Sequence, residues 1–295
     1  MFIAVEWTSS AFHTWRMAAD GTVLAEHRSQ NGVNSVKDGA FEAVLRAELG
    51  TWLPDAGAIL LSGIVTSRTG WVESPFIMVR AGLSDLIAKA ERRDFPGLPQ
   101  VHFLPGIARQ DPLPDVMRGE EMAIFGIEGE LPELVVLPGA HSKWVRTDGE
   151  RIVDLTTYIS GEILNLLRKD SLLSKLIPAD YAPSEAAFDR GVAIARDKSA
   201  LPGGVLQRLF SARSLVLFDQ LKPHEISDYL AGVMIGSEIA EVLARQPDMS
   251  SVVVIGETPV AQSYRRALQQ FGIQAPVKTG SAAAGFARLI VEMGE

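Results

Sequence analysis

Short apolar runs alternate with helical patterns in the first part of the chain. Three strand-like runs come first, joined by polar turns, and single buried strands then alternate with amphipathic stretches. The expected strands are 2–5, 12–17, 23–27, 58–61 and 101–104, and the expected helices are 40–49, 83–92 and 117–127.

The second part repeats this order. Three strands are again joined by turns, and helices with one more buried strand follow them. The expected strands are 134–137, 143–147, 151–155 and 252–255, and the expected helices are 160–167, 184–195 continuing to 218, 228–244, 260–271 and 281–293. Small residues in the stretch 228–244 would let that helix pack closely on another; they are Ala231, Gly232, Gly236 and Ala240.

The repeat predicts an α/β protein of two similar lobes. Gly129 and Pro132 interrupt the pattern near the middle, so we expect an N-terminal lobe over 1–130 and a C-terminal lobe over 131–295, with the last helix packing back on the first lobe. A chain of this plan is expected to bind its ligand in the cleft between the lobes.

Composition narrows the class of protein. The 295 residues are 47% hydrophobic and 22% charged, and no apolar stretch is long enough to span a bilayer. The absence of cysteine excludes disulfides and thiolate chemistry, and together with an N-terminus that has no basic segment it favours a cytoplasmic location. A net charge of −8 disfavours nucleic-acid binding, but a local pocket for an anionic small molecule remains compatible with it.

The stretch Leu137–Val145 carries the most informative chemistry. A buried run stops at Pro138 and Gly139, and Ala140, His141, Ser142 and Lys143 follow before strand character returns. A glycine turn with backbone N–H groups and a lysine suits an anion such as phosphate. An ordinary hairpin turn with polar surface residues is the alternative reading of this run.

Four stretches of the chain carry distinctive motifs: Pro138–Val145, Val116–Glu121, Ser160–Glu162 with Asp170–Leu172 after it, and Ser62–Ser67 with Gly70 and Trp71. These segments resemble those of the 2-dehydro-3-deoxygalactonokinase family, small sugar-acid kinases of the actin-like ATPase superfamily. The likeness is collinear over nearly the whole chain, and its first two segments combine unusual residues without gaps.

The resemblance implies a two-lobed actin-like ATPase (ribonuclease H-like) fold with an interdomain cleft. The implied reaction is transfer of the γ-phosphoryl group of ATP, with Mg²⁺, to the 6-hydroxyl of 2-dehydro-3-deoxy-D-galactonate. The implied partners are therefore ATP and a sugar acid, with no nucleic acid and no membrane; a homodimer is left open.

The resemblance also assigns roles around the Arg-Gly-Glu-Glu segment. Glu120 is the expected base for the sugar hydroxyl, with Glu121 second, and Arg118 would hold the substrate carboxylate. Glutamates in a first helical turn and a surface arginine are the structural alternatives. Glu6 would hold Mg²⁺ through water, and a surface charge at a strand end is its alternative.

Further residues are assigned to substrate and nucleotide in the same way. The sugar acid would meet Ser67, Arg68, His141, Lys143 and Glu162, although Glu162 could instead pair with Arg118 or cap its helix. The phosphates and ATP would meet two turns and a strand end: Thr8, Ser9 and Ser10; Gly139, Ala140 and Ser142; Gly256 and Glu257. Trp71, Trp144 and the small residues 280–285 are expected to be packing residues.

The chain departs from the family in both phosphate turns. Val5-Glu6-Trp7-Thr8-Ser9-Ser10 stands where the family has Ile-Asp-Trp-Gly-Ser-Thr, and Ala140 replaces a threonine. Thr8 adds a Cβ where the backbone is expected to approach a phosphate. Two alternative functions therefore stay open: a catalytically impaired relative that binds sugar acid or nucleotide, and a kinase for a related sugar acid.

Overall fold

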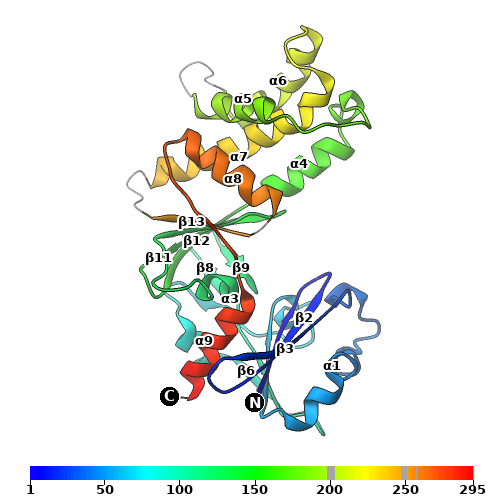
Figure 1. Cartoon of the computed structure of the whole chain (residues 1–295), viewed down its shortest axis with the longest axis vertical. Coiled ribbons are helices and arrows are strands. Elements are labelled where there is room, and N and C mark those ends of the chain that lie inside the picture. Colours follow the sequence, from blue (N-terminus) through cyan, green and yellow to red (C-terminus); the bar gives the residue numbers. More distant parts are fainter. Residues whose placement is uncertain (198–202, 247–250, 257, 295) are drawn as a thin grey trace. The chain divides into compact units, whose positions relative to one another are not determined.

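The computed structural model describes residues 1–197, 203–246, 251–256 and 258–294. These residues form two compact units (Figure 1). The first comprises Met1–Pro132, Val145–Leu155 and Gly280–Glu295, and the second comprises Glu133–Trp144 and Thr156–Thr279. The expected lobe boundary at residue 130 is two residues from the first of these breaks; two later segments also belong to the first unit.

No described helix is long and apolar enough to cross a membrane.

The first unit is built on a sheet with the order β3-β2-β1-β4-β7-β6. Its strands are β1 (Phe2–Trp7), β2 (Phe12–Met17), β3 (Val23–Ser29), β4 (Ala58–Ser62), β6 (Glu91–Arg93) and β7 (Gln100–Phe103). The first three strands form an antiparallel meander, whereas β1, β4 and β7 run parallel. The sequence pattern therefore predicted the meander correctly.

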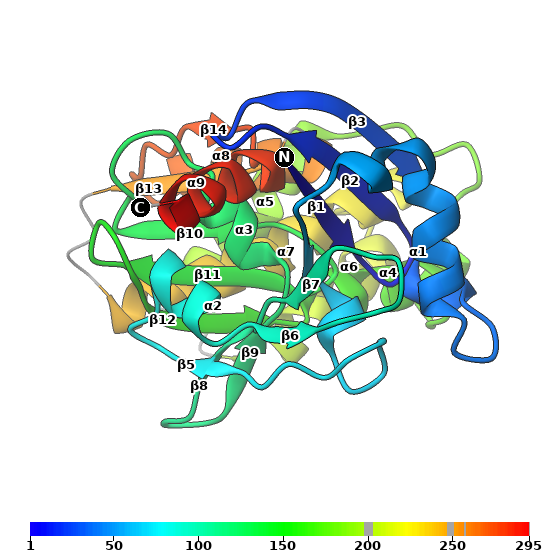
Figure 2. The ribbon, with the colours of Figure 1, turned by 90° about the horizontal axis from the view of Figure 1, so that it is seen from below.

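Helices cover both faces of this sheet (Figure 2). Ile3 and Val5 of β1 pack with Leu45 of α1 (Phe41–Leu49) in one apolar cluster. On the other face, α9 (Ala282–Gly294) contacts β1 and packs closely on α3 (Glu120–Phe125). A Cβ at Gly285 would come within 2.0 Å of the Met122 carbonyl oxygen, which confirms a packing role for the small residues 280–285.

A second sheet has the order β12-β11-β10-β13-β14; it belongs to the second unit except for Val145–Leu155 of β11 and β12, which group with the first unit. Its strands are β10 (Leu134–Leu137), β11 (Ser142–Thr147), β12 (Ile152–Tyr158), β13 (Val252–Ile255) and β14 (Val277–Lys278). Since β10 pairs in parallel with β13, as β1 does with β4, both sheets share one plan of a meander followed by a parallel strand. The expected repeat is thus present in the strand order.

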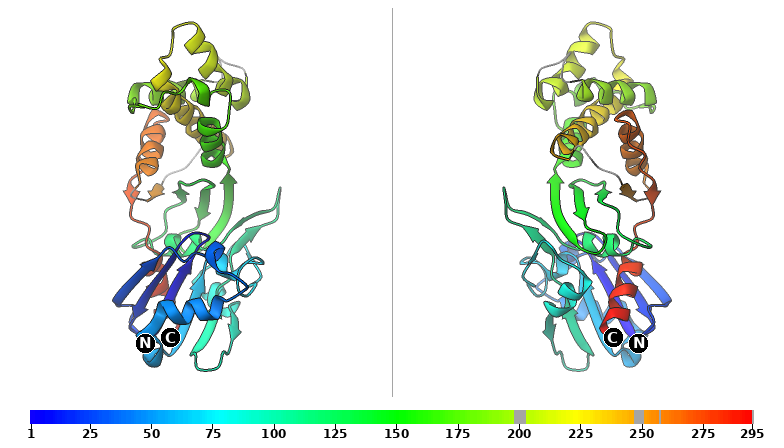
Figure 3. Two further views of the ribbon diagram at one scale, coloured as in Figure 1. Left: turned by 90° about the vertical axis from the view of Figure 1, so that its right-hand side faces the viewer. Right: turned by 90° about the vertical axis from the view of Figure 1, so that its left-hand side faces the viewer.

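Helices of the second unit stack beside its sheet (Figures 1 and 3). They are α4 (Ser160–Lys169), α5 (Glu185–Arg196), α6 (Val205–Leu217), α7 (Ile226–Arg245) and α8 (Pro259–Gln270). The backbones of α7 and α5 are in direct contact at Gly232. A Cβ added to this residue would lie only 2.1 Å from the Phe188 carbonyl oxygen. The close packing predicted for Gly232 and Gly236 is confirmed.

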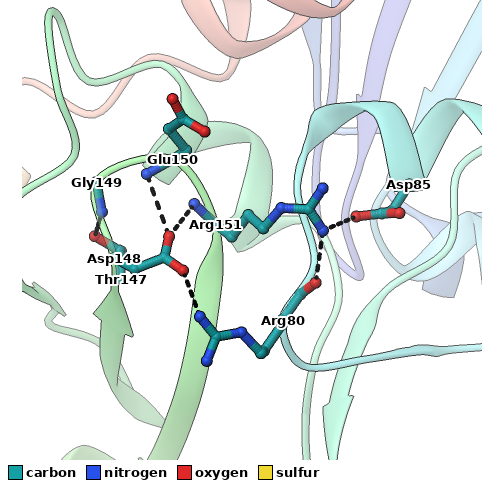
Figure 4. Close-up of polar contacts among 7 residues, drawn as sticks. All are labelled: Arg80, Asp85, Thr147, Asp148, Gly149, Glu150 and Arg151. Atoms are coloured by element: carbon teal, nitrogen blue, oxygen red, sulfur yellow. Dashed lines mark hydrogen bonds and ion pairs between the residues drawn. The ribbon is translucent and has the colours of Figure 1, made fainter.

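Ion pairs and backbone bonds join the β11–β12 turn to the segment before α2 (Leu83–Ala88) in the first unit (Figure 4). Asp148 accepts a hydrogen bond from the Arg80 side chain at 2.9 Å, and Arg151 donates to Asp85 at 3.2 Å. Ala81 and Ile152 also exchange backbone hydrogen bonds. These contacts explain why Val145–Leu155 groups with the first unit although it follows β10 in the chain.

Two predicted helices are shorter in the structure. The run 83–92 is helical only to Ala88, and 91–93 is β6, which pairs with β7. The run 117–127 begins as the end of β9 (Asp115–Met117), and α3 starts at Glu120 after Gly119 with φ of 108°. The sequence pattern also missed β9 together with β5 (Ile77–Met78) and β8 (Ile107–Arg109), a sheet too short to show a period.

Candidate functional site

The turn between β1 and β2 is closed by its own threonine. The Thr8 N–H donates to the Ala11 carbonyl at 2.9 Å, and the Ala11 N–H donates to the Thr8 hydroxyl at 3.1 Å. Among the described residues other than glycine, positive φ occurs only at Asp38, Arg80 and Asp219. The backbone at Thr8 therefore does not require glycine, and its hydroxyl takes part in the turn.

Backbone hydrogen bonds from residues 33 and 34 support this turn. Val33 and Asn34 donate their N–H groups to the carbonyls of Thr8 and Ser9, at 2.9 and 3.0 Å. The turn Thr8–Ser10 is thus fixed by backbone bonds, and Ser10 is exposed at its tip. A phosphate role for Thr8, Ser9 and Ser10 stays a prediction.

Arg118 binds the loop after β4. Its guanidinium donates to the Thr66 carbonyl at 2.6 Å and hydroxyl at 2.8 Å, and to the Ser74 carbonyl at 2.9 Å. It also lies over the Phe76 ring, 4.2 Å from the centroid. These bonds fix the loop that carries Ser67 and Arg68. Arg118 therefore has a structural role in this loop and is not simply a surface arginine.

Ser67 and Arg68 have local partners in that loop. The Ser67 hydroxyl lies 3.2 Å from the Thr69 hydroxyl, and the exposed Arg68 pairs with Glu73 at 3.5 Å. Both pairs are solvent-accessible, so a sugar acid could compete for them. Their substrate role stays a prediction.

Glu121 is a buried carboxylate at the start of α3. Its side chain is 1% exposed; both oxygens accept the Gly119 N–H at 2.8 Å, and the Ser62 hydroxyl at the end of β4 donates to it at 3.3 Å. Burial, reinforced by the neighbouring charge of Glu120, raises the pKa of Glu121 to about 7. Glu121 thus ties β4 to the turn before α3 and is withdrawn from solvent.

Glu6 and Glu120 are half-buried carboxylates that, with Glu121, make up an acidic cluster in the first unit. Glu120 is half-buried and accepts the Arg118 N–H at 2.9 Å. Burial, then the charge of Glu120, raises the pKa of Glu6 at the end of β1. The two carboxylates are therefore close enough to repel each other, an arrangement that a cation or a shared proton would relieve.

In the second unit, the turn 138–141 packs on the start of α4. A Cβ at Gly161 would lie 2.2 Å from the Gly139 carbonyl oxygen, and the Glu162 N–H donates to the Ala140 carbonyl at 3.0 Å. His141 and Glu162 form an ion pair at 2.5 Å. The structure therefore brings Gly139, Ala140, His141 and Glu162 together at the surface. The exposed residues Gly139, Ala140 and His141 are called the ledge below.

The next two residues, Ser142 and Lys143, are buried in β11. Ser142 donates its hydroxyl to Glu238 of α7 at 2.8 Å, and Lys143 lies inside the protein rather than in a solvated turn. The sequence analysis missed Glu238, because an acidic residue within a mainly apolar helix does not reveal its partners from the sequence.

Gly256 ends β13 with φ of 129°, a backbone conformation that favours glycine. The predicted nucleotide residue Glu257 lies outside the described residues. Thr258 then caps α8 by accepting the Ala261 N–H. A cavity of about 530 Å³ adjoins the starts of α5, α7 and α8; its lining includes Tyr181, Phe188, Asp228, Pro259 and Gln262.

The aromatic residues expected to pack do so. Trp71 meets Phe95 at 4.6 Å and Phe103 at 5.3 Å between ring centroids. Trp144 is buried and donates its indole N–H to Glu238. Neither tryptophan is placed as an exposed stacking platform.

The described chain matches known proteins over nearly its whole length. The family model for 2-keto-3-deoxy-galactonokinase matches residues 6–289. A probable 2-dehydro-3-deoxygalactonokinase of Rhizobium meliloti is 33% identical over 280 residues, which cover 92% of this chain and 90% of that protein. The 2-dehydro-3-deoxygalactonokinase of Escherichia coli K12 is 28% identical over 284 residues, 96% and 94% of the two chains.

Solved structures agree with this match. The crystal structure of a Sinorhizobium meliloti protein assigned as a 2-dehydro-3-deoxygalactonokinase has a TM-score of 0.88 at 31% identity and covers 99% of both chains. A Porphyromonas gingivalis protein assigned as an N-acetylglucosamine kinase has a TM-score of 0.54 at 16% identity over 100% of both chains, a likeness of fold alone. The expected actin-like ATPase fold is confirmed.

Replacing Glu121 by glutamine should change how stability depends on pH. The folded-state pKa of about 7 lies above the usual 4.5, so the stabilisation from the protonated group is complete below pH 4.5 and is lost as pH rises through 7. That loss amounts to about 3 kcal/mol. Urea unfolding between pH 4.5 and 8 should show it in the original protein and not in Glu121→Gln.

The exposed Glu128 supplies the control for this measurement. Glu128→Gln should follow the pH curve of the original protein. Parallel curves for the original protein and Glu121→Gln would contradict the burial argument.

Proposed function

Because the chain belongs to the 2-keto-3-deoxy-galactonokinase family, we propose that it transfers the γ-phosphoryl group of ATP to the 6-hydroxyl of 2-dehydro-3-deoxy-D-galactonate. The observation that carries this proposal is the match over residues 6–289, which includes the acidic cluster of the first unit and the glycine turn of the second. We further propose that the reaction takes place in the cytoplasm.

We propose Glu120 as the base. Phosphoryl transfer depends on positioning and charge neutralisation, with a carboxylate to orient the attacking hydroxyl and accept its proton. Glu120 is half-buried rather than enclosed, and its Oε2 accepts the Arg118 N–H at 2.9 Å. Glu121 is enclosed with both oxygens bonded to Gly119, which supports a positioning role for it instead.

We propose that Glu6 holds Mg²⁺ through water. Burial, and then the charge of Glu120, raises the pKa of Glu6, and a divalent cation near both carboxylates would offset their repulsion. Within the described ranges no three His, Cys, Asp or Glu side chains form a metal-binding group, so Glu6 would act with nucleotide phosphates and water. When bound, Mg²⁺ neutralises charge on those phosphates.

We propose that the second unit holds the nucleotide. The ledge formed by Gly139, Ala140 and His141 offers backbone groups to phosphates, and the cavity beside α8 is large enough for a small organic ligand. Gly256 lies just before α8 in the chain and adds no side chain there. For the sugar acid we propose Ser67 and Arg68 in the first unit; in the second unit, His141, Lys143 and Glu162 keep their predicted role in sugar-acid binding.

A coupled ADP-release assay tests the reaction. With Mg-ATP, 2-dehydro-3-deoxygalactonate should be turned over, and the gluconate epimer should be turned over at least about 10-fold less efficiently in kcat/KM. Folded protein that binds nucleotide or sugar acid by calorimetry without turnover would instead support the catalytically impaired relative. Preference for the epimer would support a related sugar acid as substrate.

Glu120→Gln should lower kcat by about 10²- to 10⁴-fold, the usual contribution of a positioned base, while ATP binding changes less than about twofold. The two measurements are the coupled assay and calorimetry with ATP. Glu128→Gln, an exposed change eight residues away, should keep full activity. An unchanged kcat in Glu120→Gln would remove Glu120 from the base role.

A further inference from the structure

Glu238 is a buried carboxylate whose described partners are all uncharged. Its residue is 2% exposed on α7. The hydroxyls of Ser142 at 2.8 Å and Tyr264 at 3.0 Å donate to it, as do the Trp144 indole and the Ser160 hydroxyl. Because a buried carboxylate is costly unless donors surround it, these partners are held firmly in place.

The donors flank the glycine turn of the second unit on both sides. Ser142 is the first residue after the turn, at the start of β11. Ser160 starts α4, whose next residues, Gly161 and Glu162, contact the carbonyls of Gly139 and Ala140. One carboxylate thus anchors both the strand that leaves the turn and the helix on which the turn rests.

Tyr264 extends the anchor to α8, the helix that follows Gly256. Its hydroxyl lies 3.0 Å from each oxygen of Glu238. The glycine turn and the helix beside the cavity are therefore fixed relative to each other through Glu238, all within the second unit.

We propose that Glu238 is a positioning residue for phosphate binding: through Ser142 and Ser160 it holds the backbone of Gly139 and Ala140 in the geometry that receives the terminal phosphates of ATP. This inference rests on the proposed kinase function. Affinity and rate depend on placing such backbone groups to within a fraction of an ångström. Removing a hydrogen bond to Glu238 should therefore weaken the contacts to the phosphates and leave contacts to more distant parts of the ligand unchanged.

Calorimetry with a non-hydrolysable ATP analogue and with AMP tests the anchor. Glu238→Gln and Ser142→Ala should each weaken binding of the analogue about 10-fold, whereas AMP affinity should stay within about twofold. Ser142→Ala removes one donor and keeps the buried carboxylate, so it serves if Glu238→Gln fails to fold.

Ser237→Ala is the matched control. Ser237 is the preceding residue on α7, equally buried, and its hydroxyl has no hydrogen-bond partner in the described structure. It should leave both affinities unchanged. The positioning role would be overturned if the variants bound AMP and the ATP analogue with equally reduced affinity. It would also be overturned if Ser142→Ala reduced the affinity for the analogue and Glu238→Gln did not. An original protein that neither binds the analogue nor turns over would overturn the kinase function itself.

A separate observation concerns the outer face of α6. Large apolar side chains are exposed there: Leu206 at 81%, Phe210 at 58%, Leu217 at 63% and the adjoining Phe218 at 75%. The spacing from 206 to 210 to 217 puts three of them on one side of the helix. Together they expose roughly 500 Å² of apolar surface, as much as the largest patches on typical monomers.

The patch is self-complementary. If a second α6 packs antiparallel with its centre near residue 212, Leu206 faces Leu217 and Phe218 of the other copy, and Phe210 faces Arg213, whose guanidinium can lie over the ring. The patch supplies more than half of the roughly 800 Å² per partner of a standard interface, and polar residues around it would supply the rest. We infer that a second copy of this chain covers α6 in a two-fold dimer.

Sedimentation velocity tests the dimer. The original protein should sediment as a dimer at micromolar concentration, and Phe210→Asp should sediment as a monomer. Leu113→Asp, an equally conspicuous exposed leucine outside α6, should remain dimeric. Because the chain has no cysteine, Ser214→Cys near the axis should form a covalent dimer on mild oxidation. A monomeric original protein, or no crosslink in Ser214→Cys, would overturn the interface.

Discussion

A buried carboxylate must be surrounded by hydrogen-bond donors, and each unit of this protein has one at the base of its candidate site. In the first unit Glu121 receives the Gly119 N–H on both oxygens and the Ser62 hydroxyl. In the second, Glu238 receives the hydroxyls of Ser142, Ser160 and Tyr264. In both cases these hydrogen bonds offset part of the cost of burying the carboxyl group, and they also fix the backbone of a turn beside a strand end.

This arrangement separates residues that hold the site from residues that could act on a ligand. The more accessible groups are the preceding residues in the sequence. Glu120 precedes Glu121, and the ledge of Gly139 to His141 precedes Ser142. Adjacent residues in the sequence therefore differ in burial, and the role proposed for each follows this difference. The family match assigns the overall chemistry, and burial then suggests how that chemistry is divided between neighbouring side chains.

The departures from the family motif fit this division. Thr8 stands where the resemblance leads one to expect glycine, but the backbone there does not need a left-handed conformation, and the hydroxyl bonds Ala11 within the turn. Ala140 contributes its carbonyl to the Glu162 N–H, a contact that any side chain allows. Both substitutions are thus compatible with intact local backbone structure around the turns.

The sequence by itself determined the two meanders, the alternation of strands and helices, and the family. Periodicity, glycine turns and gapless motifs are local signals that survive without coordinates. It did not determine the short sheet of β5, β8 and β9, because strands of two or three residues carry no period and form only where partners exist. Glu238 likewise became visible only in the tertiary structure, since its donors come from β11, α4 and α8, at separations of 26 to 96 residues along the chain.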